Sequence, residues 1–209
     1  MQETEADLST MTMRHAPATL RNRESILKIL KEVLPQSGLL LEIASGTGEH
    51  AAFMAPELAG LVWQPSEVDP AALEDIDART RTSGCTRILP ALQLDVTATI
   101  WPLSRADVIF CCNMIHIAPW AAAEGMFAGA ARLLQPSSLL ILYGPFKRNG
   151  AHTAPSNAQF ETWLQDVDPR YGVRCLDREV LPLAGSNGFA LADIVAMPAN
   201  NFSVIWRRC

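Results

Sequence analysis

Polar residues that could hold a cofactor recur where apolar runs of the chain end. A glycine-containing segment, EIASGTG at residues 42–48, follows a short apolar run. Glycine lets the backbone turn sharply and approach a ligand that a Cβ atom would block. Glu67, Asp95 and Asn113 end the next three apolar runs. If these runs are parallel strands of one sheet, the polar groups meet at the carboxyl edge, where such sheets bind ligands. The sequence therefore predicts a cofactor site at that edge.

Two cofactor classes fit this pattern. The carboxylate of Glu67 can accept hydrogen bonds from both hydroxyls of a ribose, which nicotinamide dinucleotides and S-adenosylmethionine share. Gly46 and Gly48, with Ala51 after them, also satisfy the dinucleotide pattern G-x-G-x-x-A. Glu42 favours S-adenosylmethionine, because a carboxylate inside a buried strand needs a partner, and the ligand's α-ammonium would supply one. A nicotinamide-dependent oxidoreductase stays open as the alternative.

Apolar runs alternate with helical periodicity along most of the chain. Asn22 is expected to cap the first helix, and Asp69 with Pro70 to open the third. Residues 144–157 read as a loop. The predicted strands are 39–44, 61–63, 88–94, 107–112, 138–143, 189–197 and 202–207, and the predicted helices are 23–34, 49–58, 69–80, 119–134 and 158–166.

Strands that are apolar on both faces and separated by helices indicate a parallel sheet covered on both sides. The four residues 198–201 between the last two strands force those strands to be antiparallel. The expected fold is therefore α/β, a Rossmann-like, doubly wound, mostly parallel sheet of seven strands that ends in an antiparallel hairpin. Residues 1–13 are predicted to be a mobile tail and residues 14–209 a single domain.

The composition narrows the class of protein. Hydrophobic residues make up 49% and charged residues 19% of the 209 residues, which is typical of a globular chain and excludes a fibrous or disordered one. A net charge of −5 speaks against nucleic-acid binding. No apolar run is long enough to span a membrane, and the acidic start does not resemble a secretory signal. The five cysteines form no C-x-x-C pair. We expect a cytoplasmic protein.

A set of short segments resembles a known family. The order of glycine loop, Glu67, Asp95, Asn113 and final hairpin resembles class I S-adenosylmethionine-dependent methyltransferases. More narrowly, the chain from Arg14 to Arg207 is similar to a methyltransferase-like family catalogued mainly as a domain of unknown function. The segments that carry this similarity are RNRESIL, LEIASGTGEH, WQPSEVD, CNMIHIAPW, LYGPFKRNG, SNAQF and PANN.

The resemblance implies roles for individual residues. Residues 42–48, with Glu42, Ala44, Ser45, Gly46 and Gly48, would hold the methionine portion of S-adenosylmethionine. Glu67 would bind the ribose, Asp95 with Val96 the adenine, and Asn113 with Met114 would line the wall beside the sulfonium. Ala44 departs from the superfamily, which usually has a glycine there. We expect its methyl group to be tolerated if the backbone keeps a negative φ.

Methyl transfer from a sulfonium mainly needs proximity and alignment, and a base where the acceptor must lose a proton. His116 is the predicted catalytic base, because its ordinary pKa is near neutral, and a structural role is the alternative. Trp120, Tyr143 and His152 are expected to contact the acceptor.

The basic stretch at the start of the predicted domain is expected to act as a lid. Residues 14–35 would form this lid with its helix, and Arg14 and Arg23 could pair with the methionine carboxylate. The histidines show no metal-ligand spacing, so no metal site is expected. Without a basic patch, the partner is expected to be a small-molecule substrate, neither nucleic acid nor membrane. A protein that binds S-adenosylmethionine without turning it over is a further alternative.

Overall fold

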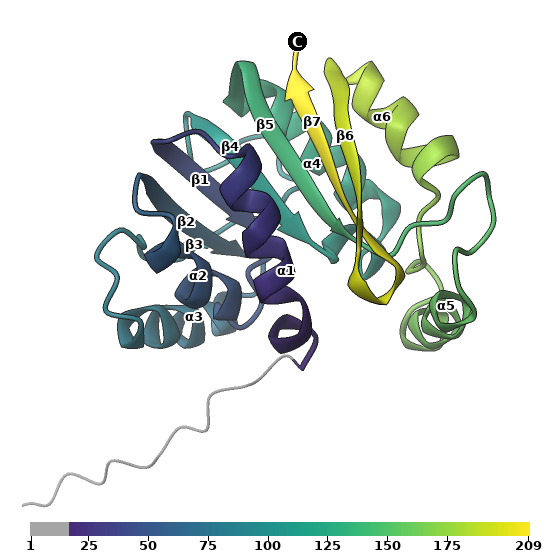
Figure 1. Ribbon diagram of the computed structural model, residues 1–209, viewed down its shortest axis with the longest axis horizontal. Helices are drawn as coiled ribbons and strands as arrows, with labels where there is room; N and C mark the ends of the chain where they lie inside the picture. The colour runs from purple at the N-terminus through teal and green to yellow at the C-terminus, as the bar shows by residue number, and fades with distance from the viewer. Residues whose placement is uncertain (1–16) are drawn as a thin grey trace, which may run out of the picture.

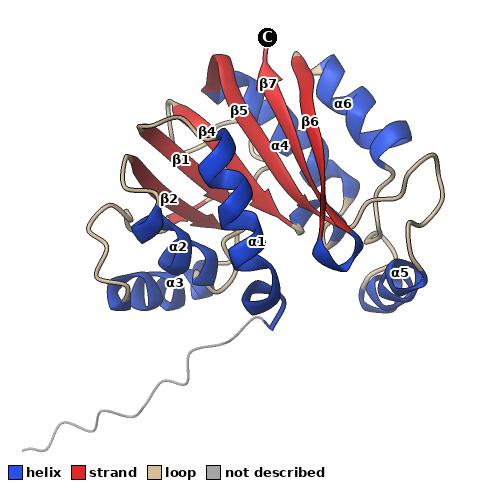
Figure 2. Cartoon of the chain, viewed as in Figure 1, coloured by secondary structure: helices blue, strands red, loops and turns tan. Residues whose placement is uncertain are grey.

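The computed structural model describes residues 17–209 and shows a seven-stranded sheet with helices on both faces (Figures 1 and 2). The strand order is β3-β2-β1-β4-β5-β7-β6. This confirms the α/β, mostly parallel fold that the sequence predicts. The strands are β1 Gly38–Ile43, β2 Leu61–Glu67, β3 Leu92–Gln93, β4 Ala106–Cys112, β5 Leu134–Gly144, β6 Phe189–Met197 and β7 Asn201–Arg208.

The first five strands run parallel, and β7 runs antiparallel to both β5 and β6. The turn Pro198–Asn200 joins β6 to β7, so the predicted hairpin is confirmed. The carboxyl ends of β1 to β5 share one edge of the sheet. The amino end of β7 and the hairpin turn lie at the same edge, the lower one in Figure 1.

Two apolar cores fill the space between the sheet and its helices. One joins α1 and α2 to a face of the sheet through side chains such as Leu30, Trp63 and Phe110. The other joins α4 and α6 to the opposite face, around Phe127 and Trp206. The helices are α1 Pro17–Val33, α2 Glu49–Met54, α3 Pro70–Thr82, α4 Trp120–Leu133, α5 Pro155–Val167 and α6 Leu181–Ser186.

The first helix differs from its prediction. It begins by residue 17, so Asn22 lies inside α1 and does not cap it. The buried Asn22 side chain instead contacts His50 and Cys112. Helix α1 packs against the sheet through Ile26 and Leu30, so the described part of the expected lid is a core helix. The expected tail, residues 1–13, and Arg14 lie outside the described residues.

Three further elements differ because of proline. The third strand pairs with β2 only at Leu92 and Gln93, since Pro90 has no N–H to donate, although Ile88 forms a lone bridge to Trp63. Helix α5 begins at Pro155, within the predicted loop. A π-helical turn, Leu176–Val180, and α6 were not predicted; α6 carries Pro182 in its first turn, where proline is compatible with a helix.

Within residues 17–209, no helix combines the length and the apolar character that crossing a bilayer requires.

Candidate functional site

A cavity of about 480 Å³ opens at the carboxyl edge of the sheet, within the usual size range of small-molecule sites. We call it the strand-end cavity. Residues after β1, β2, β3 and β4 line it, so the sheet brings together groups that are far apart in the sequence. Six predicted cofactor residues line it: Ala44, Gly46, Glu67, Asp95, Val96 and Met114. Ser45, Gly48 and Asn113 do not line it, and Asn113 lines a second cavity described below.

The loop after β1 is fixed by backbone hydrogen bonds. The Ser45 N–H donates to the Ser66 carbonyl over 2.8 Å, and the Gly48 N–H donates to the Ser45 carbonyl over 2.9 Å. Gly48 has a φ of +73°, and a Cβ atom there would come within 3.1 Å of Ile76 on α3. Only glycine therefore fits this close approach of the loop to α3.

Ala44 adopts a φ of +56°. The condition under which its methyl group was expected to be tolerated, a negative φ, is therefore not met. Left-handed backbone brings the Cβ atom of an L-residue close to the following carbonyl oxygen, which costs about 1–2 kcal/mol. The loop keeps the left-handed turn that glycine usually supplies and carries this strain at the cavity wall.

Glu67 lies at the mouth of the glycine loop. Its Oε2 accepts a hydrogen bond from the Gly46 N–H over 2.9 Å, and its Oε1 accepts one from the Val68 N–H over 2.8 Å. Asp69 caps α3 by accepting from the Ala71 N–H, as predicted, so Glu67 is not needed as a cap. Each carboxylate oxygen retains a lone pair that can accept a further hydrogen bond.

Asp95 lies across the cavity from the loop. Its Oδ1 accepts from both the N–H and the hydroxyl of Thr97, over 2.8 and 2.7 Å. No described residue contacts its Oδ2, which can accept from a ligand. The walls of the cavity are mostly apolar and include Leu94, Val96, Met114, Ile117 and Ala122. Tyr171, which was not predicted from the sequence, adds an aromatic ring.

Glu42 lies beneath the loop and does not line the cavity. Its carboxyl is buried, and Oε2 accepts from the Ser45 hydroxyl and the Trp63 indole N–H, each over 2.9 Å. Burial raises the pKa of Glu42 to about 7, although these two hydrogen bonds act in the opposite direction. Glu42 therefore has hydrogen-bond partners inside the protein, and its bond to Ser45 helps to hold the loop after β1.

A chain of buried polar side chains leads from Glu42 toward the end of β5. His50 on α2 places Nδ1 3.8 Å from Glu42 Oε1 and Nε2 2.9 Å from the Asn22 carbonyl oxygen Oδ1. Because that oxygen only accepts, Nε2 carries the proton and donates it. The Asn22 amide also hydrogen-bonds to the Tyr143 phenol. Burial lowers the pKa of His50 to about 4, so its ring is neutral at pH 7.

A second cavity, of about 250 Å³, adjoins the end of β4. We call it the amide cavity, because four asparagine side chains line it: Asn22, Asn113, Asn157 and Asn201. Asn113 has a φ of +62° and lines this cavity, whereas Cys112 and Met114 on either side of it line the strand-end cavity. Consecutive residues at the end of β4 thus border the two cavities.

Of the residues predicted to contact the acceptor, Tyr143 lines the amide cavity. Sequence reasoning missed Arg21, Phe160 and three of the four asparagines. The sequence did single out the segments that contain these residues, because RNRESIL, SNAQF and PANN carry the family resemblance. No local pattern in these segments says that α1, α5 and the hairpin turn meet in space.

His116, the predicted base, is fully buried and lines neither cavity. Its Nδ1 accepts from the Arg174 backbone N–H over 3.2 Å, and its ring meets Phe146 edge to face. Nε2 has no hydrogen-bond partner among the described residues. Burial, with the Arg174 charge nearby, lowers the pKa of His116 to about 3. This position corrects the expectation that His116 faces an acceptor.

Three other predicted residues lie away from both cavities. The Arg174 guanidinium covers the Trp120 ring, 5.5 Å from its centre. His152 Nε2 lies 2.8 Å from Glu161 Oε2, and the other oxygen of Glu161 binds Lys147. Arg23 stacks on Phe53 at 4.3 Å. These contacts give each side chain a structural partner, so the expected substrate and lid roles have no geometric support here.

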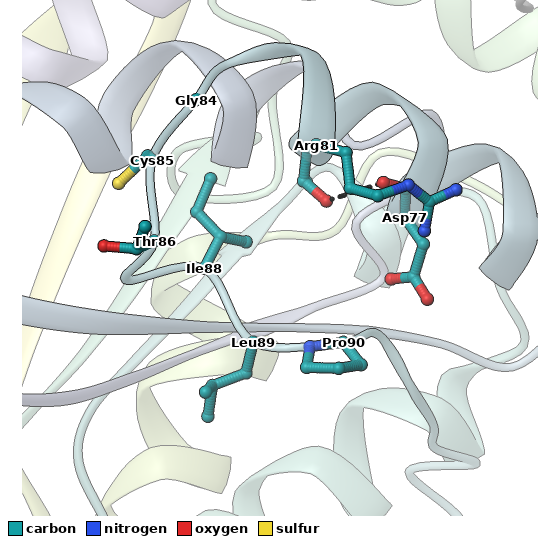
Figure 3. Close-up of a pocket in the computed structure, with 9 residues that line it drawn as sticks. Asp77, Arg81, Gly84, Cys85, Thr86, Ile88, Leu89 and Pro90 are labelled. Atoms are coloured by element: carbon teal, nitrogen blue, oxygen red, sulfur yellow. Dashed lines mark hydrogen bonds between the residues drawn. The ribbon is translucent and has the colours of Figure 1, made fainter.

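A third hollow, of about 390 Å³, lies beside α3 and the loop after it (Figure 3). None of the residues that line the strand-end cavity lines this hollow, and the carboxylate of Asp77 already accepts a hydrogen bond from the Ala91 N–H. Residues 17–209 also contain no group of three or more His, Cys, Asp or Glu side chains placed to hold a metal ion. The two cavities at the carboxyl edge are therefore the better candidates for a functional site.

Solved structures with a similar fold are methyltransferases. An O-methyltransferase family protein from Burkholderia thailandensis shares 14% identity at a TM-score of 0.78, over 91% of this chain and 57% of that one. Human N-acetylserotonin methyltransferase in complex with S-adenosylmethionine shares 14% at 0.75, over 91% and 52%. A putative sarcosine dimethylglycine methyltransferase from Galdieria sulphuraria shares 14% at 0.72, over 91% and 86%.

The chain spans little more than half the length of the first two of these structures. At such low identity the likeness shows the fold, which is that of class I methyltransferases. A family match covers nearly the whole chain, from residue 13 to residue 208, and its description is "Protein of unknown function (DUF938)". The chain therefore belongs to the DUF938 family and has the Rossmann-like fold of S-adenosylmethionine-dependent methyltransferases.

Proposed function

We propose that the protein binds S-adenosylmethionine in the strand-end cavity and transfers its methyl group to a small-molecule acceptor held in the amide cavity. One observation carries this proposal: consecutive residues at the end of β4 border the two cavities, at the carboxyl edge of the sheet. A cofactor in one cavity and an acceptor in the other would meet there without a large movement of the backbone.

The residues of the strand-end cavity fit this cofactor. Glu67 has a free lone pair on each oxygen for the two ribose hydroxyls, and Asp95 Oδ2 can accept from the adenine amine. The walls around Val96 and Met114 suit a flat apolar ring. When bound, the sulfonium supplies an already activated methyl group. The chain then has to hold and align the two reactants, which can lower the barrier by about 7–11 kcal/mol.

Two alternatives make different predictions about binding. A nicotinamide dinucleotide could use Glu67 in the same way, but β7 runs antiparallel and therefore does not complete a second mononucleotide-binding half. A protein that only holds S-adenosylmethionine would bind it without turnover. The human neighbour that binds S-adenosylmethionine supports the first proposal at the level of the shared fold.

Thermal unfolding with S-adenosylmethionine, S-adenosylhomocysteine, NADH and NADPH in parallel tests the cofactor. A ligand at a hundred times its Kd adds about 2.7 kcal/mol to stability. We expect the two sulfur ligands to raise Tm by roughly 5–11 °C at that ratio and the nicotinamides to leave it unchanged. A rise with NADH or NADPH alone would overturn the proposal.

Calorimetric titration of S-adenosylhomocysteine into Glu67→Gln tests the site. Loss of hydrogen bonds to a charged group should weaken binding by roughly 10- to 150-fold, from about 1.5–3 kcal/mol. Glu74→Gln is the matched control, because Glu74 is an exposed carboxylate on the neighbouring helix α3 and lines neither cavity. Equal affinities of the two variants would place the ligand elsewhere.

A further inference from the structure

The amide cavity contains hydrogen-bond donors and no acidic side chain. None of its described lining residues is Asp or Glu. Arg21 reaches it from the exposed side of α1 and makes no ion pair within residues 17–209. The amide of Asn113 is likewise without a hydrogen-bond partner in that part of the chain. A guanidinium and a free amide at one small cavity favour an anionic ligand.

Tyr143 adds a third donor. The side chains of Asn22 and Asn201 act to lower the pKa of its phenol. Tyr143 lines the cavity, where its O–H can donate to a ligand. Burial nevertheless raises the pKa of Tyr143 to about 12. The phenol therefore stays protonated near pH 7 and can donate to a ligand without serving as a base.

No general base is present among the described residues that line the cavity. His, Asp, Glu, Lys and Cys are absent from its described lining, and His116 is fully buried and does not line it. His50 directs its Nε2 proton toward Asn22, which lines the cavity. An acceptor that must lose a proton, such as an alcohol or an ammonium group, finds no described side chain to take it.

We infer that the acceptor is a small carboxylic acid, methylated on its carboxylate oxygen to a methyl ester, with Arg21, Asn113 and Tyr143 holding the carboxylate. This inference rests on the proposed function. A carboxylate is already deprotonated near pH 7, so it needs donors to orient it and no base. The volume of about 250 Å³ restricts the acceptor to a small molecule, and the Phe160 ring offers its carbon skeleton an apolar wall.

The reaction balances without a proton. A carboxylate oxygen forms a bond to the methyl carbon as the bond between that carbon and sulfur breaks, and the electron pair of the broken bond stays on sulfur. One anion and one sulfonium cation become a neutral ester and a neutral thioether. As the negative charge disappears, the hydrogen bonds from Arg21, Asn113 and Tyr143 weaken, which favours release of the ester.

The experiment uses S-adenosylmethionine with a tritium-labelled methyl group and a low-molecular-weight extract of the cells that make the protein. Methyl esters release methanol in mild alkali, whereas methyl ethers, amines and thioethers do not. We expect the full-length protein to transfer label into small molecules and alkali to convert that label into volatile methanol. Label that survives alkali would overturn the inference and leave the proposed function in place.

Variants test the three donors. Arg21→Gln and Tyr143→Phe should raise the amount of extract needed for half-maximal labelling by roughly 10-fold or more, since each removes a hydrogen bond to a charged group. Their affinity for S-adenosylhomocysteine should stay that of the unsubstituted protein, which also shows that they fold. Arg81→Gln, an exposed arginine of α3 that is remote from the amide cavity, is the matched control. Unchanged labelling by both cavity variants would contradict the inference.

The remaining outcomes separate the two proposals. Failure to bind S-adenosylhomocysteine overturns the proposed function itself. Binding without any transfer of label overturns the carboxylate acceptor and favours a protein that only holds the cofactor. His15 lies outside the described residues, and His15→Ala tests whether it serves as the base. If the variant still produces alkali-labile label, the inference is supported. If labelling is lost while S-adenosylhomocysteine still binds, the inference is contradicted.

Discussion

Glu42 Oε1 and His50 Nδ1 face one another 3.8 Å apart inside the protein, directly beneath the glycine loop. Burial raises the pKa of Glu42 to about 7 and lowers the pKa of His50 to about 4. Near neutral pH the histidine is therefore uncharged, and the carboxyl is about half ionised. Because the histidine is uncharged, the contact is not an ion pair. Burial opposes ionisation of the Glu42 carboxyl, so the folded chain loses stability when this group ionises.

Glu42→Gln should stabilise the ligand-free protein at high pH. The folded pKa of about 7 lies above the ordinary glutamate pKa of 4.5, so the folded chain loses stability as pH rises from 4.5 to 7. The full loss is about 3 kcal/mol above pH 7. Glutamine keeps an oxygen for Trp63 and Ser45 but does not ionise. Urea unfolding should show a gain about 2 kcal/mol larger at pH 8 than at pH 5.

The exposed Glu74→Gln provides the control, with no such change between the two pH values. A constant difference between the Glu42 variant and the unsubstituted protein would show that the carboxyl ionises in the folded state as easily as in the unfolded one.

The same substitution should weaken cofactor binding. A carboxyl that costs stability is expected to have a use, and the ligand's α-ammonium is the cation that the proposed function would bring near the loop. We predict that S-adenosylhomocysteine binds Glu42→Gln roughly tenfold more weakly, or about 1.4 kcal/mol. Calorimetric titration at pH 8, where the variant is the more stable protein, checks this. An unchanged Kd would mean that Glu42 acts on the loop alone.

Some parts of this site follow from the sequence and others do not. Glu67 and Asp95 were predictable, because alternating strands and helices fix where parallel strands end and therefore which polar residues share an edge. Asn22 and Asn201 were not, since they meet at Tyr143 only through the packing of α1 and the hairpin. His116 follows Asn113 closely in the sequence, but the left-handed backbone of Asn113 and the turn after it direct the ring into the core.

His116→Asn tests the buried position of that ring. The folded pKa of about 3 lies below the ordinary histidine pKa of 6.5, so the unfolded chain takes up the proton first and stability falls as pH drops below 6.5. At pH 5 this loss is about 2 kcal/mol. Asparagine keeps an acceptor for the Arg174 N–H but does not titrate, so the variant should lose about 2 kcal/mol less than the unsubstituted protein between pH 7.5 and pH 5.

Chemical unfolding at the two pH values measures this difference. The methyl-transfer assay supplies the second readout, and we expect the variant to retain turnover at pH 7.5, where it is folded. A collapse of kcat with an unchanged pH dependence of stability would instead restore His116 as the catalytic base.

Ala44→Gly should stabilise the protein slightly. Removing the Cβ atom relieves the left-handed strain and raises the free energy of unfolding by about 1–2 kcal/mol. The greater freedom of glycine in the unfolded chain lowers it by about 0.4–1 kcal/mol. The net gain lies between about 0 and 1.6 kcal/mol, measured by urea unfolding. Ala71→Gly on α3 is the control, because helical backbone there makes the same change destabilising by about 0.5–1 kcal/mol. Equal losses at both positions would mean that Ala44 carries no strain.

Gly144→Ala should disturb the boundary between the two cavities. A Cβ atom there would lie 2.6 Å from His116 Nε2 and 3.2 Å from Asn113 Oδ1, and both groups are held by the end of β4. Overpacking of this kind costs about 1–3 kcal/mol. Because Asn113 must shift, S-adenosylhomocysteine should also bind more weakly, which calorimetry measures. Gly185→Ala is the control: no atom lies within 4 Å of its Cβ position on α6, so alanine should stabilise that helix by up to about 1 kcal/mol. If Gly144→Ala loses stability but binds the ligand unchanged, Asn113 does not border the bound cofactor, and the meeting of the two cavities would have to be sought at another residue.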